Sequence, residues 1–421
     1  MKKLLILSYF FPPCNLTASN RVHGWAKYLV EHGYYPIIVT RNWEVQGASE
    51  KERLRKSGED IKVIKNDRFE VHYLPYKPSL RDYCLNAGMS LLSRVFTLIE
   101  LVLKNFTLQA IPYRNLYYHA RKLMEEDNEL RLLFISANPY EQFLFGYRLK
   151  KKFTDLKFVA EYRDEWTTSR TYPRARGKNS LIRKLESISE FKWLQHADLV
   201  ITTCQYFASR IGSKIKRPVE IIGHGVDNDS LSKKKKAIVD QQVFKIVYGG
   251  TLYNNQPVEE LLEVWSEFSG NKPDVELLFL GSQLENNTEN RLRPYFDSCV
   301  VATKRVVKAK SDEIQSHAAM LLLLPYEGMT GWPSSKLYHY LAHNKPILFY
   351  PSDSDIMEQV LTDTNVGIIP SNREDLLQTL NHYYELWKCK ELYPVEAENL
   401  YKYSQAYQAQ ILANHLSQLS T

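Results

Sequence analysis

One strand, loop, helix and strand pattern in the second half of the chain restricts the fold more than any other part of the sequence. The apolar run Met320–Leu324 predicts a strand that is buried on both faces of a parallel sheet. A loop with two glycines follows, then Ser334 and Ser335 as candidate N-caps of a helix that runs to about His343, and then a second apolar strand at Pro346–Tyr350. Such a unit places backbone N–H groups at the carboxyl edge of a sheet, where they suit a phosphate. We therefore expect an α/β fold with a ligand-binding edge at this point.

The helix of this pattern is predicted to be amphipathic, with an apolar face on the sheet and a basic face toward solvent or a ligand. The apolar face contains Leu337, Tyr340 and Leu341, and the basic face contains Lys336, His339 and His343. The basic face either stays in water, as most charged faces do, or binds an anion. The two histidines have the helical spacing of a metal pair, but no third ligand is evident, so no metal is expected.

The composition indicates a globular protein of about two domains. The chain has 421 residues, of which 44% are hydrophobic and 24% are charged. Its 55 basic and 48 acidic residues give a net charge of +7 without a dense basic stripe. This balance argues against nucleic-acid binding and fits anionic small molecules or a membrane surface.

The cysteines and the N-terminus indicate a reducing compartment. The five cysteines are isolated, with no Cys-x-x-Cys pair, which argues against a disulfide framework and against a zinc site. The opening MKKLLILSYFFPPC lacks a small-residue cleavage site and leads into an amphipathic helix. We read it as the first strand of a sheet and expect a cytoplasmic protein.

Two successive alternations of strands and helices predict two Rossmann-like domains. We expect the first domain at residues 1–228 and the second at 243–396, with a solvated linker around Lys233–Lys236. A helix within residues 397–421 is predicted to cross back to the first domain. The first domain opens with a strand at Lys3–Tyr9 and a helix that Ser19 caps.

Arg21 lies early in that first helix. It either meets an anionic group on the acceptor side of a site or is an ordinary surface arginine.

Residues 89–112 are unusually apolar around most of a helical circumference. Arg94, Glu100 and Lys104 interrupt them too often for a membrane-spanning helix. The segment is either a core helix or a surface that seats the protein on a membrane or a lipid acceptor.

Charged residues directly follow the apolar strand predicted at Phe158–Tyr162. This position, at the carboxyl end of a parallel strand, is where α/β enzymes keep their chemistry. Asp164 is the leading candidate for a general base or a charge stabiliser. The alternative is a structural ion pair between Asp164 and Arg163 or another arginine.

The second domain begins with a strand at Phe244–Tyr248, followed by a tight turn, Gly249-Gly250-Thr251. Glycine lets the backbone approach a ligand closely, so this turn is a second candidate binding element. Further along, Asp353 and Asp355 imitate a metal-binding pair, but their place before a helix favours capping.

Several motifs together resemble the retaining glycosyltransferases of the GT-B architecture, in the large family-four group that builds bacterial cell-surface polysaccharide and lipopolysaccharide. The resemblance covers nearly the whole chain, and each motif is weak alone. The motifs are the proline-rich loop within Tyr9–Arg21, Arg163-Asp164-x-Trp166, Ala197-Asp198-x-Val200-Ile201, Gly225-Val226-Asp227, and Pro333-Ser334-Ser335-Lys336-Leu337-Tyr338 followed by Lys345-Pro346-Ile347-Leu348.

The resemblance implies two Rossmann-like domains that face each other across a cleft. It implies a nucleotide sugar as co-substrate on the second domain, a glycan or lipid-linked acceptor on the first, retention of configuration, and no cofactor or metal. With the position of Asp164 after a strand, it makes Asp164 and Arg163 the candidate catalytic residues. The donor-binding residues that it implies are Gly249, Gly250, Thr251, Arg305, Ser334, Ser335, Lys336 and His339.

The sequence also departs from the family pattern. His339 stands where the family often has a glutamate, and Gln256 stands about where a lysine is common. Arg163 occupies roughly the place of a catalytic-site histidine. Two other functions therefore stay open: a nucleotide-sugar epimerase of the same architecture, and a glycan-binding subunit that has lost catalysis.

Overall fold

The protein divides into two compact units in a computed structural model. One unit is Met1–Gly225 with Gln405–Thr421, and the other is Val226–Ser404. Residues 397–404, which the sequence placed with the returning helix, lie with the second unit. The linker expected around Lys233–Lys236 lies outside the described residues. The structure describes residues 1–14, 17–43, 54–104, 106–169, 180–228, 239–282 and 290–419.

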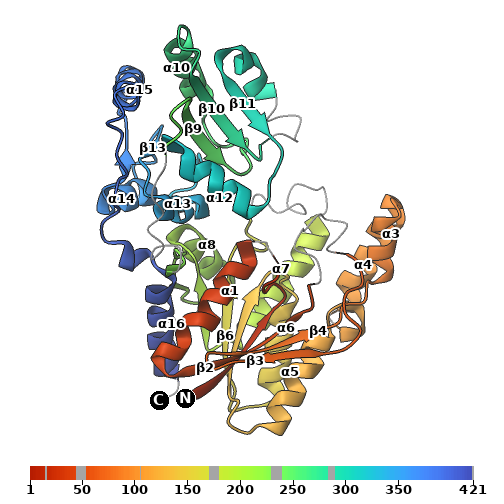
Figure 1. Ribbon diagram of the computed structural model, residues 1–421. Helices are drawn as coiled ribbons and strands as arrows, with labels where there is room; N and C mark the ends of the chain where they lie inside the picture. The colour runs from red at the N-terminus through yellow and green to blue at the C-terminus, as the bar shows by residue number, and fades with distance from the viewer. Residues whose placement is uncertain are drawn as a thin grey trace. The chain divides into compact units, whose positions relative to one another are not determined.

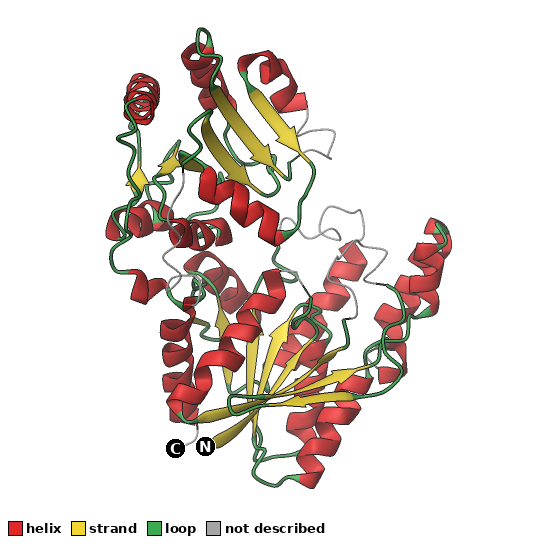
Figure 2. Ribbon diagram, viewed as in Figure 1, coloured by secondary structure: helices red, strands yellow, loops and turns green. Residues whose placement is uncertain are grey.

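An eight-stranded sheet forms the centre of the first unit, and helices cover both of its faces (Figures 1 and 2). Its strand order is β3-β4-β2-β1-β5-β6-β7-β8, and only the edge strand β3 is antiparallel to its neighbour. The strands are β1 (Lys2–Ser8), β2 (Tyr34–Arg41), β3 (Lys62–Lys65), β4 (Glu70–Leu74), β5 (Leu132–Ala137), β6 (Lys157–Tyr162), β7 (Leu199–Thr202) and β8 (Glu220–Ile221). The α-helices are α1 (Thr17–Tyr28), α3 (Leu80–Asn86), α4 (Ser90–Leu103), α5 (Asn115–Glu126), α6 (Gln142–Lys152), α7 (Ser180–Leu194), α8 (Gln205–Ile215) and α16 (Gln405–Leu419).

The last helix, α16, completes one hydrophobic core of this unit. Leu412 and Leu416 are fully buried and share a cluster with Val22 of α1 and Ile6 of β1. Burying such aliphatic side chains stabilises a fold by about 1.5 to 3 kcal/mol each. The sequence-based expectation that the C-terminal helix belongs with the first sheet agrees with this packing.

The second unit has a six-stranded parallel sheet in the order β11-β10-β9-β12-β13-β14. The strands are β9 (Phe244–Gly249), β10 (Val275–Leu280), β11 (Val300–Thr303), β12 (Met320–Leu323), β13 (Ile347–Phe349) and β14 (Gly367–Ile368). The α-helices are α10 (Glu259–Ser269), α12 (Lys308–His317), α13 (Ser335–Tyr340), α14 (Ile356–Asp363) and α15 (Arg373–Lys388). The α/β fold class with two Rossmann-like sheets is confirmed.

Each sheet contains one point at which the strand order reverses. In the first unit this point lies between β1 and β5, and in the second it lies between β9 and β12. The loops that follow the two strands at such a point run in opposite directions, so a crevice forms between them at the carboxyl edge of the sheet. The fold therefore specifies one candidate ligand position in each unit.

Two local interpretations were wrong, and one strand was not predicted. Ser19 does not cap the first helix, because α1 already begins at Thr17 and the Ser19 hydroxyl donates to the Cys14 carbonyl at 2.6 Å. The edge strand β3 was missed within a polar stretch. The core-helix reading of residues 89–112 fails as well, because most apolar side chains of α4 are exposed. Among the described residues, no helix is long and apolar enough to cross a membrane.

Candidate functional site

The turn after β9 brings the backbone close to the first residues of α13. Gly250 has a φ of 95°, a left-handed conformation that side-chain-bearing residues rarely adopt. A Cβ atom on Gly250 would lie 3.0 Å from Cε of Lys336, and one on Gly249 would lie 3.4 Å from the Tyr340 hydroxyl. Both glycines therefore leave room for side chains of α13.

Lys336 lies against this turn rather than in open water. Its Nζ donates to the Thr251 carbonyl at 3.1 Å and to the Tyr248 hydroxyl, and it lies 4.0 Å from the centroid of the Tyr248 ring. Desolvation lowers the pKa of Lys336 to about 7. Among the described residues no carboxylate contributes to this shift, so an anionic ligand would supply a counter-charge to the ammonium.

Much of the hydrogen-bonding capacity of the backbone around Lys336 is used inside the protein. The Gly249 N–H donates to the Tyr340 hydroxyl at 2.8 Å, and the Gly250 N–H donates to the Leu280 carbonyl at 2.7 Å. Ser334 is the N-cap of α13, and its hydroxyl accepts from the Lys336 N–H at 3.3 Å. The Lys336 ammonium has three donors and uses two of them here. The side chain, more than an array of amides, is thus the group that can bind a phosphate.

The helical-wheel prediction for α13 is partly right. Leu337, Tyr340 and Leu341 are buried as expected, and His339 is exposed as expected. His343 is buried, however, so it does not belong to a solvent-facing basic face. Lys336 and Tyr340 are four residues apart, and both reach the turn after β9. The expected opposition between them was wrong because residues four apart lie on the same side of a helix.

Arg305 lies at the same edge of the sheet, just after β11. A Cβ atom on Gly281 would lie 3.5 Å from Cγ of Arg305 and 3.6 Å from Cα of Gly250. The Ser282 hydroxyl donates to the Gly250 carbonyl at 2.7 Å. The loops after β9, β10 and β11 therefore converge, and the exposed Arg305 belongs to their rim.

Aromatic rings that the sequence analysis missed surround this point. Tyr326 packs on Trp332 with ring centroids 4.4 Å apart, and Tyr253 lies 5.9 Å from Tyr326. The signal was present in the sequence, because Tyr253 and Tyr326 lie a few residues after β9 and β12, and Trp332 flanks the glycine loop. Such rings can contact the base or the sugar of a nucleotide ligand.

Asp353 and Asp355 have structural roles. Asp353 accepts from the N–H groups of Asp355 at 3.0 Å and Met357 at 3.1 Å, so it caps α14 as predicted. Asp355 accepts from the N–H of Gly331 and holds the glycine loop. Among the described residues there is no group of three or more His, Cys, Asp or Glu side chains that could hold a metal ion.

In the first unit, Asp164 follows β6 and pairs with its neighbour. Nε of Arg163 donates to Oδ2 of Asp164 at 2.9 Å, and the Asp164 side chain is 50% exposed. Desolvation opposes ionisation, but the charge and hydrogen bond of Arg163 and the charge of His224 prevail, so the pKa of Asp164 is lowered. The ion-pair alternative is thus present, and it leaves an ionised carboxylate accessible.

The Asp164 loop is held by an aromatic support. The Tyr140 hydroxyl donates to the carbonyls of Asp164 at 3.1 Å and Glu165 at 2.7 Å. The Tyr140 ring stacks on Trp166 at 5.2 Å with an interplanar angle of 6°. This packing explains the tryptophan of the Arg163-Asp164-x-Trp166 motif as a fixed anchor for the loop.

A buried carboxyl group lies behind the same loop. Glu190 accepts from the Tyr162 hydroxyl at 2.8 Å and from the Thr167 hydroxyl. Burial raises the pKa of Glu190 to about 7. Glu190 therefore connects α7 to both ends of the Asp164 loop.

Arg21 is a buried arginine, so the surface alternative was wrong. It is 8% exposed, and it donates to Glu161 at 2.7 Å and to the carbonyls of Ile222 and Gly223. These bonds join α1, β6 and the segment after β8. Through these bonds Arg21 holds the carboxyl end of β6 in place. A direct contact between Arg21 and an acceptor stays a prediction.

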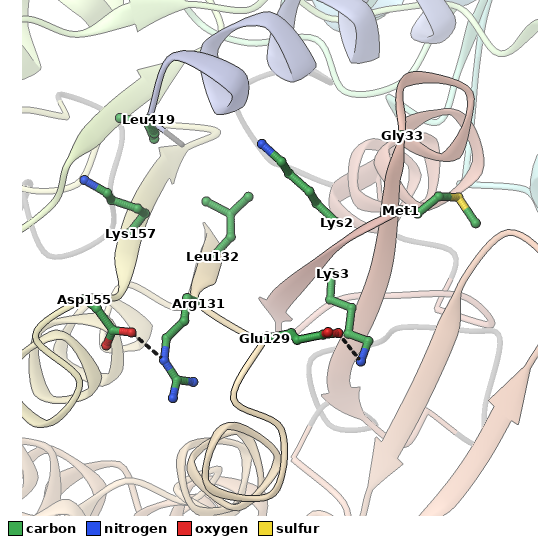
Figure 3. A pocket seen from close by; sticks show the side chains of 10 residues that line it. All are labelled: Met1, Lys2, Lys3, Gly33, Glu129, Arg131, Leu132, Asp155, Lys157 and Leu419. Carbon is green, nitrogen blue, oxygen red and sulfur yellow. Dashed lines mark hydrogen bonds and ion pairs between the residues drawn. The ribbon is translucent and has the colours of Figure 1, made fainter. Parts of the chain in front are cut away.

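A large hollow of about 770 Å³ lies at the opposite edge of the first sheet (Figure 3). Lys2, Arg131 and Lys157 line it at the amino ends of β1, β5 and β6. Figure 3 shows that Arg131 is paired with Asp155. Ligands of open α/β sheets bind at the carboxyl ends of the strands, so no step of a reaction is placed in this hollow.

Comparisons with known proteins show the fold. No family model matches the sequence, and no curated protein matches it. The solved structures that are similar include sucrose-phosphate synthase from Thermosynechococcus elongatus, with a TM-score of 0.61, 12% identity and coverage of 100% of this chain and 99% of that one.

Two further similar structures carry ligands. One is an E. coli trehalose-6-phosphate protein bound with UDP-2-fluoro glucose, with a TM-score of 0.59, 11% identity and coverage of 99% of each chain. The other is an α,α-trehalose-phosphate synthase (UDP-forming) from Burkholderia xenovorans in complex with glucose-6-phosphate, with a TM-score of 0.58, 10% identity and coverage of 100% of each chain. The chain therefore has the GT-B fold of these glycosyltransferases over its whole length.

Proposed function

We propose that the protein is a retaining glycosyltransferase that moves a sugar from a nucleotide sugar to a glycan or lipid-linked acceptor. The observation that carries this proposal is the position of Lys336. Its ammonium lies beside the Gly249-Gly250 turn, at the point where the strand order of the second sheet reverses, and no carboxylate within the described parts of the chain contributes to its pKa shift. The GT-B fold and the motif resemblance support the same class.

The donor would be bound by the second unit. Its diphosphate would lie against Gly250 and Thr251, with Lys336 as the charge that stabilises the leaving nucleoside diphosphate. Ser334 and Ser335 at the start of α13 would add contacts. Arg305 on the rim would meet the base or the phosphates. His339, which is exposed, would hydrogen-bond a ribose hydroxyl in place of the family glutamate.

Chemistry on the acceptor side would involve Asp164. In the reaction the bond between the anomeric carbon and the phosphate oxygen breaks, and the acceptor hydroxyl loses a proton as the new glycosidic bond forms. An ionised, accessible carboxylate can stabilise the positive charge that develops on the sugar or accept that proton. Arg163 would hold Asp164 in its ionised form. We propose no metal in this reaction, and a place in cell-surface polysaccharide synthesis at the inner face of the cell membrane.

The test begins with a thermal-shift screen of UDP, GDP, dTDP and CMP sugars, because a ligand that binds the folded state raises its apparent stability. The sugar that binds is then used in transfer assays with and without acceptors. Turnover without an acceptor would instead indicate the nucleotide-sugar epimerase. Binding without any turnover would indicate a glycan-binding subunit.

Asp164→Asn should reduce transfer by orders of magnitude while donor affinity changes little. Asp127→Asn is a matched control, because Asp127 pairs with Lys3 near the amino end of β1. Near-normal turnover of Asp164→Asn would remove Asp164 from the mechanism.

A further inference from the structure

The hairpin of α3 and α4 in the first unit has its polar and apolar faces reversed. The two helices pack on each other at the margin of the unit (Figure 1). Leu91 is 73% exposed, and Phe106, just after α4, is 79% exposed, while Asp82 is 1% exposed and Lys104, directly after α4, is also buried. A helix of a globular protein normally buries its apolar face, so this apolar surface is built to be covered by something else.

The polar inner face of the hairpin encloses a cavity of about 200 Å³. Glu100 and Lys104 of the hairpin line it, together with Tyr9 after β1 and Asn138 and Glu141 after β5. These two strands flank the point at which the strand order of the first sheet reverses. The cavity thus occupies the ligand position that the topology of the first unit specifies.

The chemistry of the cavity suits a group rich in hydroxyls. Glu141 accepts from Lys104 at 3.1 Å and from the Tyr113 hydroxyl at 3.0 Å, and Asp82 accepts from the Tyr76 hydroxyl at 2.8 Å. Among the lining residues that the structure describes, three carboxylates, those of Asp82, Glu100 and Glu141, face two cationic side chains, so a phosphate would be disfavoured. Tyrosine rings and hydrogen-bonding carboxylates fit the apolar and hydroxyl faces of a sugar.

The cavity is connected to the Asp164 loop. Nζ of Lys104 lies 5.8 Å from the centroid of the Trp166 ring. Pro139 and Glu141, which line the cavity, flank Tyr140, whose hydroxyl bonds to the Asp164 carbonyl. A sugar in the cavity would therefore lie next to the loop that carries the proposed catalytic carboxylate.

We propose that the apolar face of the α3–α4 hairpin lies on an anionic lipid bilayer and that the cavity beneath it binds the sugar end of a lipid-linked acceptor. The proposal rests on the proposed function and specifies which acceptor the site takes. The 14 residues of α4 span about 21 Å, less than the roughly 30 Å of a bilayer core, so the hairpin lies on the membrane.

The charges favour a bilayer over a second copy of the chain. Within the described part of residues 77–106, the exposed charged residues are Lys77 and Arg94, while Arg81 and Glu100 are half-buried. Both exposed residues are basic, so they are attracted to anionic lipid headgroups. A symmetric contact between two copies would bring the same basic residues together.

The membrane part is tested by flotation of the full chain with vesicles of phosphatidylcholine alone and of phosphatidylcholine with about 30% phosphatidylglycerol. Wild type should float with the anionic vesicles, and Leu91→Glu with Leu98→Glu should reduce the bound fraction about tenfold. Both leucines are exposed, so these changes should leave the fold intact. Tyr393→Glu, at an equally exposed position in the second unit, is the control and should float like wild type.

Equal flotation of the double variant and wild type would overturn the membrane assignment. The membrane assignment would also be overturned if the wild type did not bind vesicles but formed a dimer in light scattering, and the double variant did not form that dimer. These measurements use no nucleotide sugar. Loss of donor binding would therefore count against the proposed function alone, and loss of flotation against the hairpin alone.

The cavity is tested with n-octyl glycosides of common hexoses below their micelle concentration. At least one should bind to wild type, with affinity about tenfold lower in Ala110→Trp, which fills the cavity, and in Glu100→Gln, which removes a charge from its lining. Nucleotide-sugar affinity should be unchanged in both variants. The assignment of the cavity would be overturned if the wild type bound none of the glycosides, or if both variants bound them as tightly as the wild type.

Discussion

The lowered pKa of Lys336 makes a specific prediction for the pH dependence of donor binding. A diphosphate beside the ammonium favours its charged form, so binding above pH 7 must take up a proton. With a free pKa of about 7 and a bound pKa well above 8, the affinity falls by a factor of about ten between pH 6 and pH 8. The ligand for this measurement is a nucleotide sugar, because its phosphates do not titrate in this range.

Isothermal titration in two buffers of different ionisation enthalpy measures this linkage directly. At pH 8 the wild type should take up close to one proton for each nucleotide sugar that it binds. Lys336→Met should bind more weakly and without proton uptake, and Lys336→Arg should bind without proton uptake because arginine stays charged. Wild-type affinity that does not change with pH, with no proton uptake, would refute the assignment of Lys336 to the phosphate site.

The same residue should lower the stability of the free protein. The folded pKa is below the unfolded value of 10.5, so the unfolded state binds more protons between about pH 7 and pH 10.5, and stability rises with pH in that window. The full penalty, at most about 5 kcal/mol, applies below pH 7. Lys336→Met should therefore raise the melting temperature at pH 6 while it weakens donor binding.

Two further substitutions test the surroundings of the proposed site. Gly250→Ala should destabilise the fold by about 1 to 2 kcal/mol and weaken nucleotide-sugar binding, because the new methyl group meets Lys336. Gly328→Ala is the control, because Gly328 also has a positive φ but no atom lies near its Cβ, so this variant should show the backbone strain alone. Equal losses of binding in the two variants, measured by calorimetry, would contradict this reading. The folded protein favours the protonated form of Glu190, whose pKa is raised to about 7, so the wild type loses stability as the pH rises to this value. Glu190→Gln removes this loss, so in urea denaturation it should stabilise the protein by about 2 to 3 kcal/mol more at pH 8 than at pH 5. A Glu190→Gln effect that is the same at both pH values would place the pKa of this carboxyl near its ordinary value.

The strands and the N-cap of the central pattern could be predicted because they depend on local chemistry. Met320–Leu323 is apolar on both faces, and the Ser334 hydroxyl accepts from an N–H two residues away. Such short-range signals are written in neighbouring residues. The glycine turn after β9 was predicted for the same reason.

The long-range contacts of the site could not be predicted in this way. Arg21 pairs with Glu161, which is 140 residues distant, and no local pattern shows that its donors are used inside the protein. A helical wheel shows that Leu91 and Leu98 of α4 share a face, but it does not show which face points outward. The reversed hairpin became visible only when the burial of Asp82 and Lys104 was known.

The discontinuous course of the chain has a consequence for biosynthesis. Unit one needs Ala409, Leu412 and Leu416 of α16 in its core, and these residues are synthesised after the whole of the second unit. The continuous segment Val226–Ser404 can thus fold while the earlier-made sheet still lacks one wall. We therefore expect the second unit to be able to fold before the first is complete, and the nascent first sheet to expose apolar surface until α16 has been synthesised.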